Sequence, residues 1–224
     1  MSARHDFYGP VHKGLRFASA QLLIRLGSND WQCARASAAL IAALRHHLEV
    51  ARAHLEHEEA EFHPVLRARA PELADALDHD HAEHHATFDA LAALIAAVEA
   101  AVDAERPAAA HRLYLRYSLY VSDDLAHMAS EELEVQPIAH ALFTDAELQA
   151  IEGRIVASIP PEQMAESLSI MLPAMTPLER ATFLRNVGAG APPEAFAMIR
   201  DVIARNCLSQ QDHARLVGEL ALAA

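Results

Sequence analysis

The sequence predicts an all-α protein, and composition and spacing both point to this class. Ala and Leu dominate the chain, and only 7 of its 224 residues are glycine. Apolar residues recur at steps of three and four, which is the helical period, and no alternating β-branched run occurs. The 11 prolines fall mostly between the periodic segments. A hydrophobic content of 52% is enough to form a substantial core.

The first two thirds of the chain contain the longest periodic segments. Asn29 or Asp30 is suited to cap the second of them, and Pro71 and Pro107 stand where the third and fourth begin. Short breaks between long helices favour an antiparallel up-down four-helix bundle. The expected helices are 8–26, 30–68, 71–104 and 107–142.

The pattern of the sequence changes after Thr144, where long periodic segments give way to short ones. Short helical segments follow, separated by "IPPEQ", "LPAMTP", "GAGAPP" and "LSQQD", and few histidines occur there. We therefore expect two parts: a bundle over 1–144 and a C-terminal helical appendage over 145–224. The appendage shows no recognisable chemistry, and we expect it to pack on the bundle, on a protein partner or on a second copy as a homodimer.

Charge and cysteine usage exclude several classes of protein. A formal net charge of −13 argues against a nucleic-acid partner, because phosphate backbones are bound by clustered Lys and Arg. No secretory signal and no apolar run long enough to cross a membrane is visible. Cys33 and Cys207 lie far apart and lack metal-binding spacing, as is typical of reduced cytoplasmic thiols. We expect a cytoplasmic protein.

One phrase occurs twice, as "HLEHEEAEFHP" from His54 and as "HMASEELEVQP" from His127. In each copy a His and a Glu lie one helical turn apart, Glu58 after His54 and Glu131 after His127, on an otherwise apolar stripe. A buried carboxylate is costly unless it is paired or binds a metal. The repetition favours metal ligands over two separate hydrogen-bonded pairs. Glu132, on the adjacent stripe, remains a rival to Glu131.

The positions of the 15 histidines on their helices indicate which of them could be metal ligands. In "DHDHAEHHATF", His81 and His85 lie one turn apart and continue into an apolar stripe, with His84 beside them. His12 lies on the apolar stripe of the first helix. His47 and His57 stay unassigned. The histidines expected at the surface or in capping roles are His5, His46, His63, His111, His140 and His213.

Several histidines and two glutamates inside a bundle suit two divalent metals of octahedral preference, above all iron, although another divalent metal would also fit. No cysteine is placed to be a ligand, which argues against structural zinc and iron–sulfur sites. Paired metals in bundles usually share carboxylate bridges, so Glu58 and Glu131 are the candidate bridging ligands.

The chain resembles the hemerythrin-like (HHE cation-binding) family over about residues 8–142, in "VHKGLR", "HLEHEEAEFHPVL", "HAEHHATF" and "HMASEEL". The resemblance implies a non-haem di-iron (Fe–O–Fe) centre that binds O2 or a related diatomic molecule. It makes Glu58 and Glu131 bridging ligands. The terminal ligands it implies are His12, His54, His81, His85 and His127.

The chain departs from the oxygen carriers of that family, which place an Asp five residues after the last histidine ligand. Here Glu131 and Glu132 follow His127 by four and five residues, as in iron-sensing members. Those members use a single His on the third helix, so the choice between His84 and His85 stays open.

The sequence favours a non-enzymatic protein that binds or senses O2, NO or iron. Two alternatives remain. One is a di-iron oxidase or peroxidase-type enzyme, whose Glu-x-x-His pairs this chain matches only with Asp, at Asp78 and Asp124. The other is a metal-free helical protein that acts through its tail.

Overall fold

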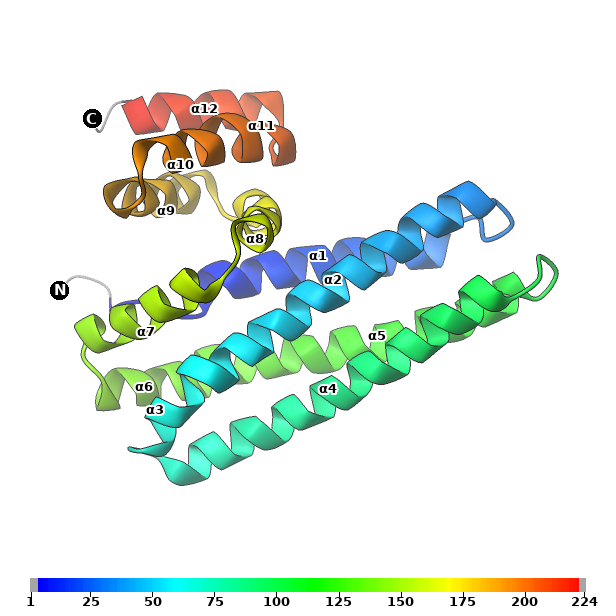
Figure 1. The fold of residues 1–224 in the computed structure, drawn as a ribbon, viewed down its shortest axis with the longest axis horizontal. Coiled ribbons are helices and arrows are strands. Elements are labelled where there is room, and N and C mark those ends of the chain that lie inside the picture. Colours follow the sequence, from blue (N-terminus) through cyan, green and yellow to red (C-terminus); the bar gives the residue numbers. More distant parts are fainter. Residues whose placement is uncertain (1–3, 222–224) are drawn as a thin grey trace. The chain divides into compact units, whose positions relative to one another are not determined.

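The computed structural model describes residues 4–221, and every regular element in this range is a helix (Figure 1). The all-α class predicted from composition and spacing is therefore confirmed. No helix within 4–221 is long and apolar enough to cross a membrane. The helices are α1 (Gly9–Ser28), α2 (Ala34–Glu61), α3 (His63–Arg67), α4 (Pro71–Ala100), α5 (Arg106–Ser130), the π-helical turn η1 (Glu131–Val135), α6 (Gln136–Leu142), α7 (Asp145–Ser158), α8 (Pro161–Ala174), α9 (Pro177–Gly190), α10 (Pro193–Met198), the π-helical turn η2 (Ile199–Ile203), α11 (Ala204–Cys207) and α12 (Gln210–Ala221).

The described chain forms two compact units. The first contains 4–8 and Ala18–Ser158, and the second contains Gly9–Phe17 and the residues from Ile159 onward. In the first unit, α4 packs against both α2 and α5, and the short segment 101–105 joins α4 to α5. The second unit has its own small core, formed by residues that include Leu172, Leu184 and Leu216.

Helix α7 lies in the first unit, although the sequence grouped residues 145–158 with the appendage. Its Asp145 pairs with Arg4 at 2.6 Å, and its Arg154 pairs with Glu61 of α2 at 2.6 Å. Its Leu148 and Ile151 are buried in one apolar cluster of this unit. That residues 1–144 form a domain stays a prediction.

The two longest expected helices are each interrupted just after the repeated phrase. The helix expected over 30–68 breaks at Phe62 into α2 and α3, and the one expected over 107–142 widens into η1. Pro64 and Pro137 end the two copies of the phrase. Because proline has no backbone N–H, it cannot complete the α-helical ladder, and a break or a widened turn results. Both copies therefore end in irregular backbone.

A buried polar contact connects α1 and α2 in the core of the first unit. His47 is 5% exposed, and its Nε2 lies 3.0 Å from Ser19 Oγ. Its ring makes an edge contact with Tyr117, at 6.5 Å between ring centroids. Burial, and then the neighbouring His46, lowers the pKa of His47 to about 4. His47 is therefore neutral in the folded protein at neutral pH.

The pKa of His47 predicts a loss of stability in acid. The unfolded chain takes up the proton near pH 6.5, whereas the folded state resists it down to about pH 4. Stability is therefore complete above pH 6.5 and falls as the pH drops from 6.5 to 4. From 1.36 kcal/mol per pKa unit, His47 contributes a loss of about 3 kcal/mol.

Urea unfolding of the metal-free protein at pH 7, 6, 5 and 4 measures this loss. The variant His47→Gln is expected to show a shallower decline than the parent protein, while the control His79→Gln, at an exposed position, keeps the parent decline. Equal declines in the parent and His47→Gln would contradict the assignment.

Candidate metal centre

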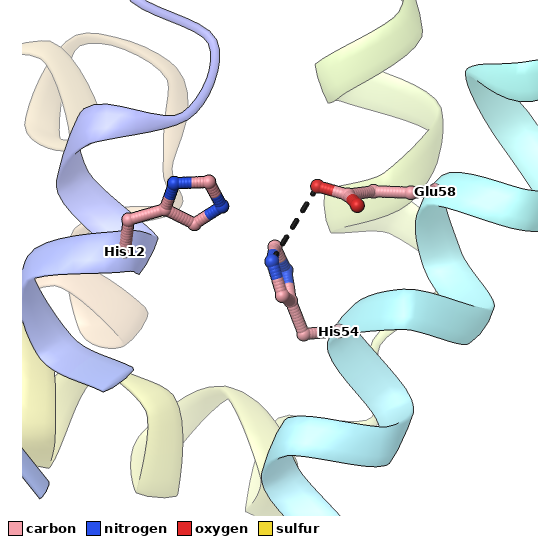
Figure 2. Close-up of side chains that lie close together, drawn as sticks. All are labelled: His12, His54 and Glu58. Carbon is pink, nitrogen blue, oxygen red and sulfur yellow. Dashed lines mark ion pairs between the residues drawn. The ribbon is translucent and has the colours of Figure 1, made fainter. Parts of the chain in front are cut away.

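The repeated phrase places two His–Glu pairs inside the first unit. His54 and Glu58 lie one turn apart on α2, with Nε2 3.4 Å from Oε1 (Figure 2). His127 near the end of α5 lies 3.5 Å, Nε2 to Oε2, from Glu131, the first residue of η1. Glu58 is 2% exposed and Glu131 is fully buried. Both carboxylates thus face the interior, as the apolar stripes predicted.

The donor atoms gather into three groups, and within each group one donor atom per residue lies within 4.8 Å of the others. Glu58 belongs to the first and second groups, and His81 belongs to the second and third. Figure 2 shows the first group, with His12 on α1 and with His54 and Glu58 on α2. The groups are His12–His54–Glu58, Glu58–His63–His81 and His81–His127–Glu131.

All the predicted ligands except His85 occur in these groups. His85 is half-buried on α4 and contacts Glu59 and Arg52 instead. His84 is 8% exposed, and its ring lies 4.7 Å from that of His127, between centroids. The rival carboxylate Glu132 is half-buried, whereas Glu131 is fully buried.

The surface role assigned to His63 is wrong. His63 is 2% exposed and joins Glu58 and His81 in the second group. An uninterrupted helix would carry its apolar stripe through Phe62 and leave His63 beside it. Instead the helix breaks at Phe62, and both residues are buried. Pro64, directly after His63, was the sequence signal for this break.

The charge states in the centre follow from burial. Burial, and then the nearby Glu131 carboxylate, raises the pKa of Glu58 well above its ordinary value. Burial lowers the pKa of His127 to about 4 and outweighs the opposing effect of Glu131. Burial is the main cause that raises the pKa of Tyr8, and the negative charges of Glu131 and then Glu58 raise it further. Without a metal, burial therefore favours a neutral imidazole at His127 and a protonated carboxyl group at Glu58.

Several buried atoms that could bind a metal have no hydrogen-bond partner among residues 4–221. They are Nε2 of His63, His81, His84 and His127, and Oε2 of Glu58. A buried polar atom without a partner usually costs about 1–3 kcal/mol. Imidazole nitrogens and carboxylate oxygens are the donors that divalent iron, manganese and zinc accept in proteins. The residues present therefore fit a bound metal.

No curated protein and no solved structure gave a significant match. The family described as "Hemerythrin HHE cation binding domain" matches residues 11–139, which is more than half of the chain and contains every residue of the three groups. The match, the helical fold and the buried His and Glu donors agree. The chain belongs to the hemerythrin HHE cation-binding domain family.

Proposed function

We propose that the protein holds two non-haem iron ions in a four-helix bundle and that it binds or senses O2, NO or iron. One observation supports this most strongly. His81 Nε2 lies 3.6 Å from Glu58 Oε2 and 3.9 Å from Glu131 Oε1, so one imidazole is close to both buried carboxylates. Two metals that share these glutamates as bridges would use all three groups of donors. Another divalent metal with the same ligand preferences would fit as well.

In this proposal the ligands divide between two metal positions. His12 and His54 would bind beside Glu58, and His127 would bind beside Glu131. His81 is common to two groups and would bind between them.

The up-down bundle is part of the proposal. The short connection of α4 to α5 by residues 101–105 and the packing of α4 on α2 support antiparallel neighbours. Ser19 of α1 contacts both His47 of α2 and Tyr117 of α5, which supports α1 as the remaining member.

A bound iron pair would supply a centre to which a small diatomic molecule binds and with which it exchanges electrons. The surrounding residues keep water away from this centre. Leu55, Phe62, Met128 and Val135 are all buried on the elements that carry the ligands. Two ionised glutamates would balance half of the charge of two divalent ions, and the imidazoles would donate lone pairs to them, which favours burial of the ions.

A binding role is favoured over a ferritin-like oxidase. That class uses a Glu-x-x-His pair whose carboxylate faces the metal. The nearest match on α4 begins with Asp78, but this carboxylate contacts His63 Nδ1 at 2.7 Å and the guanidinium of Arg67. Asp78 is 45% exposed in its side chain and is held at the outside of the centre.

The remaining parts of the proposal concern partners and location. Exposed apolar side chains of the second unit, such as Leu178 (70%) and Met198 (54%), support contact with a protein partner or a second copy. Free Cys33 and Cys207 support a reducing, cytoplasmic location.

Loading with iron tests the function. The protein, made without a His-tag, is loaded anaerobically with Fe(II), and bound iron is measured before and after O2 is admitted. About two irons per chain are expected, with a spectral change that reverses when O2 is removed. An irreversible change with turnover would favour the oxidase, and no tightly bound iron in a folded protein would favour the metal-free alternative.

The two buried glutamates are predicted to dominate metal affinity. Glu58→Ala and Glu131→Ala should each weaken binding by more than the roughly 10–100-fold that loss of a ligand's hydrogen-bond partner costs. Glu61→Ala is the matched control from the same repeated phrase, because Glu61 pairs with Arg154 at 2.6 Å and lies outside the groups. Chelator competition measures all three affinities. Equal losses in the three variants would contradict the assignment.

Metal uptake is predicted to release protons. Because the pKa of Glu58 is raised in the metal-free centre, a proton must leave when a cation binds. Affinity should therefore rise with pH through the neutral range. Calorimetry in buffers of different ionisation enthalpy should show release of about one proton per chain, and less release in Glu58→Gln. Buffer-independent binding heats would contradict this account.

A further inference from the structure

We propose that His63, and not His85, completes the metal-ligand set beside His81, and that His85 is a positioning residue that acts on His81 through Glu59. This inference rests on the proposed metal-binding function and deepens it. It changes the ligand set that the family resemblance implies, at one position of that set.

His63 has the geometry of a metal ligand. Its ring centroid lies 4.6 Å from that of His81, and it shares a candidate group with His81 and Glu58. Its Nδ1 lies 2.7 Å from Asp78 Oδ1. A carboxylate at Nδ1 holds the proton on that nitrogen and leaves the lone pair on Nε2. That Nε2 is buried and has no hydrogen-bond partner among residues 4–221.

Asp78 is itself fixed as a charged acceptor. Its Oδ1 accepts a hydrogen bond from His63 Nδ1, and its Oδ2 accepts one from the guanidinium of Arg67. Arg67 also pairs with Asp75 at 3.1 Å, which holds the guanidinium against α4. The Asp78 carboxylate therefore lies on the outer side of the His63 imidazole, and Nε2 of that ring is on the opposite side. This is the arrangement that protein metal sites use to orient a histidine ligand.

His85 has the opposite geometry. Its Nε2 lies 2.9 Å from Glu59 Oε1, and its Nδ1 lies 3.3 Å from Arg52 Nη1. Arginine can only donate, so Nδ1 accepts from Arg52 and the proton of His85 is on Nε2, facing Glu59. Arg52 is held in turn by Asp89, at 2.7 Å. Both nitrogens of His85 are engaged, and neither presents a lone pair to a metal.

Glu59 connects His85 to the metal centre. The same Oε1 atom that accepts from His85 lies 3.1 Å from His81 Nδ1. Glu59 therefore orients His81 as Asp78 orients His63. In both cases Nδ1 faces a partly exposed carboxylate, and His81 Nε2 lies 3.6 Å from Glu58 Oε2. His81 on α4 and His63 on α3 thus share one candidate group with the same buried carboxylate, Glu58.

Matched substitutions test the assignment in the full-length protein. His63→Gln, His85→Gln and the exposed control His79→Gln are titrated with Co(II) and with Fe(II) in competition with a chelator. His63→Gln should weaken binding more than 100-fold or lower the metal content from about two ions per chain to about one. Loss of a ligand's hydrogen-bond partner typically weakens metal binding by roughly 10–100-fold, and loss of the ligand itself should weaken it more. His85→Gln should cost about 10-fold at most, and His79→Gln should cost nothing.

Two further readouts separate ligation from a structural role. In the paramagnetic NMR spectrum of the Co(II) form, each histidine ligand gives a strongly shifted ring N–H signal. One such signal should disappear in His63→Gln, and none should disappear in His85→Gln. In His63→Gly, added imidazole should restore metal content, which it would not do for a residue that only packs. Circular dichroism checks that each variant is folded.

The outcomes distinguish this inference from the proposed function. If His63→Gln binds metal as the parent does while Glu58→Ala does not, the assignment of His63 is overturned and the metal function stands. If His85→Gln loses a shifted N–H signal, His85 is a ligand and the inference is overturned. If the parent protein takes up no metal, both fall together.

Discussion

Two carboxylates buried side by side constrain the whole first unit. Glu58 and Glu131 come from different elements, and neither is more than 2% exposed. Two negative charges this close in an apolar interior repel strongly, so at least one group must keep a proton or a cation must lie between them. The raised pKa of Glu58 shows the first solution in the metal-free protein. The donors around the pair provide for the second.

The acidic residues of this unit fall into two kinds by depth. The buried glutamates Glu58 and Glu131 can approach a metal directly. Glu59 and Asp78 stay partly exposed and accept hydrogen bonds from Nδ1 of His81 and His63, so the other ring nitrogen, Nε2, is left without its proton. Arg67 pairs with Asp78 from the solvent side, where a salt bridge is less costly to form than in the interior.

Local spacing predicted which carboxylates within each helix are buried. His54 with Glu58 and His127 with Glu131 follow from the one-turn step and an apolar stripe, and the structure buries both carboxylates. The choice among the α4 histidines depends on how that helix is rotated against its neighbours. That rotation is a property of packing, and periodicity alone gives no information on it.

The parts that the sequence did not predict depend on backbone irregularity and long-range contacts. His63 is buried because the helix breaks at Phe62, whereas a continuous helix was expected. The grouping of α7 with the first unit depends on ion pairs such as Arg4 with Asp145, which join residues distant in the sequence. The change in sequence composition at Thr144 marks where long helical segments give way to short ones, and it carries no information on such ion pairs.

Anomalous diffraction from crystals of the full-length protein grown anaerobically with Fe(II) tests the central claim most directly. Data at the iron absorption edge locate each metal without assumptions about its ligands. The account predicts about two strong peaks per chain, both in contact with Glu58 and Glu131, and with His63 Nε2 at bonding distance from one of them. Peaks confined to exposed histidines such as His79, with the glutamate pair metal-free, would contradict it.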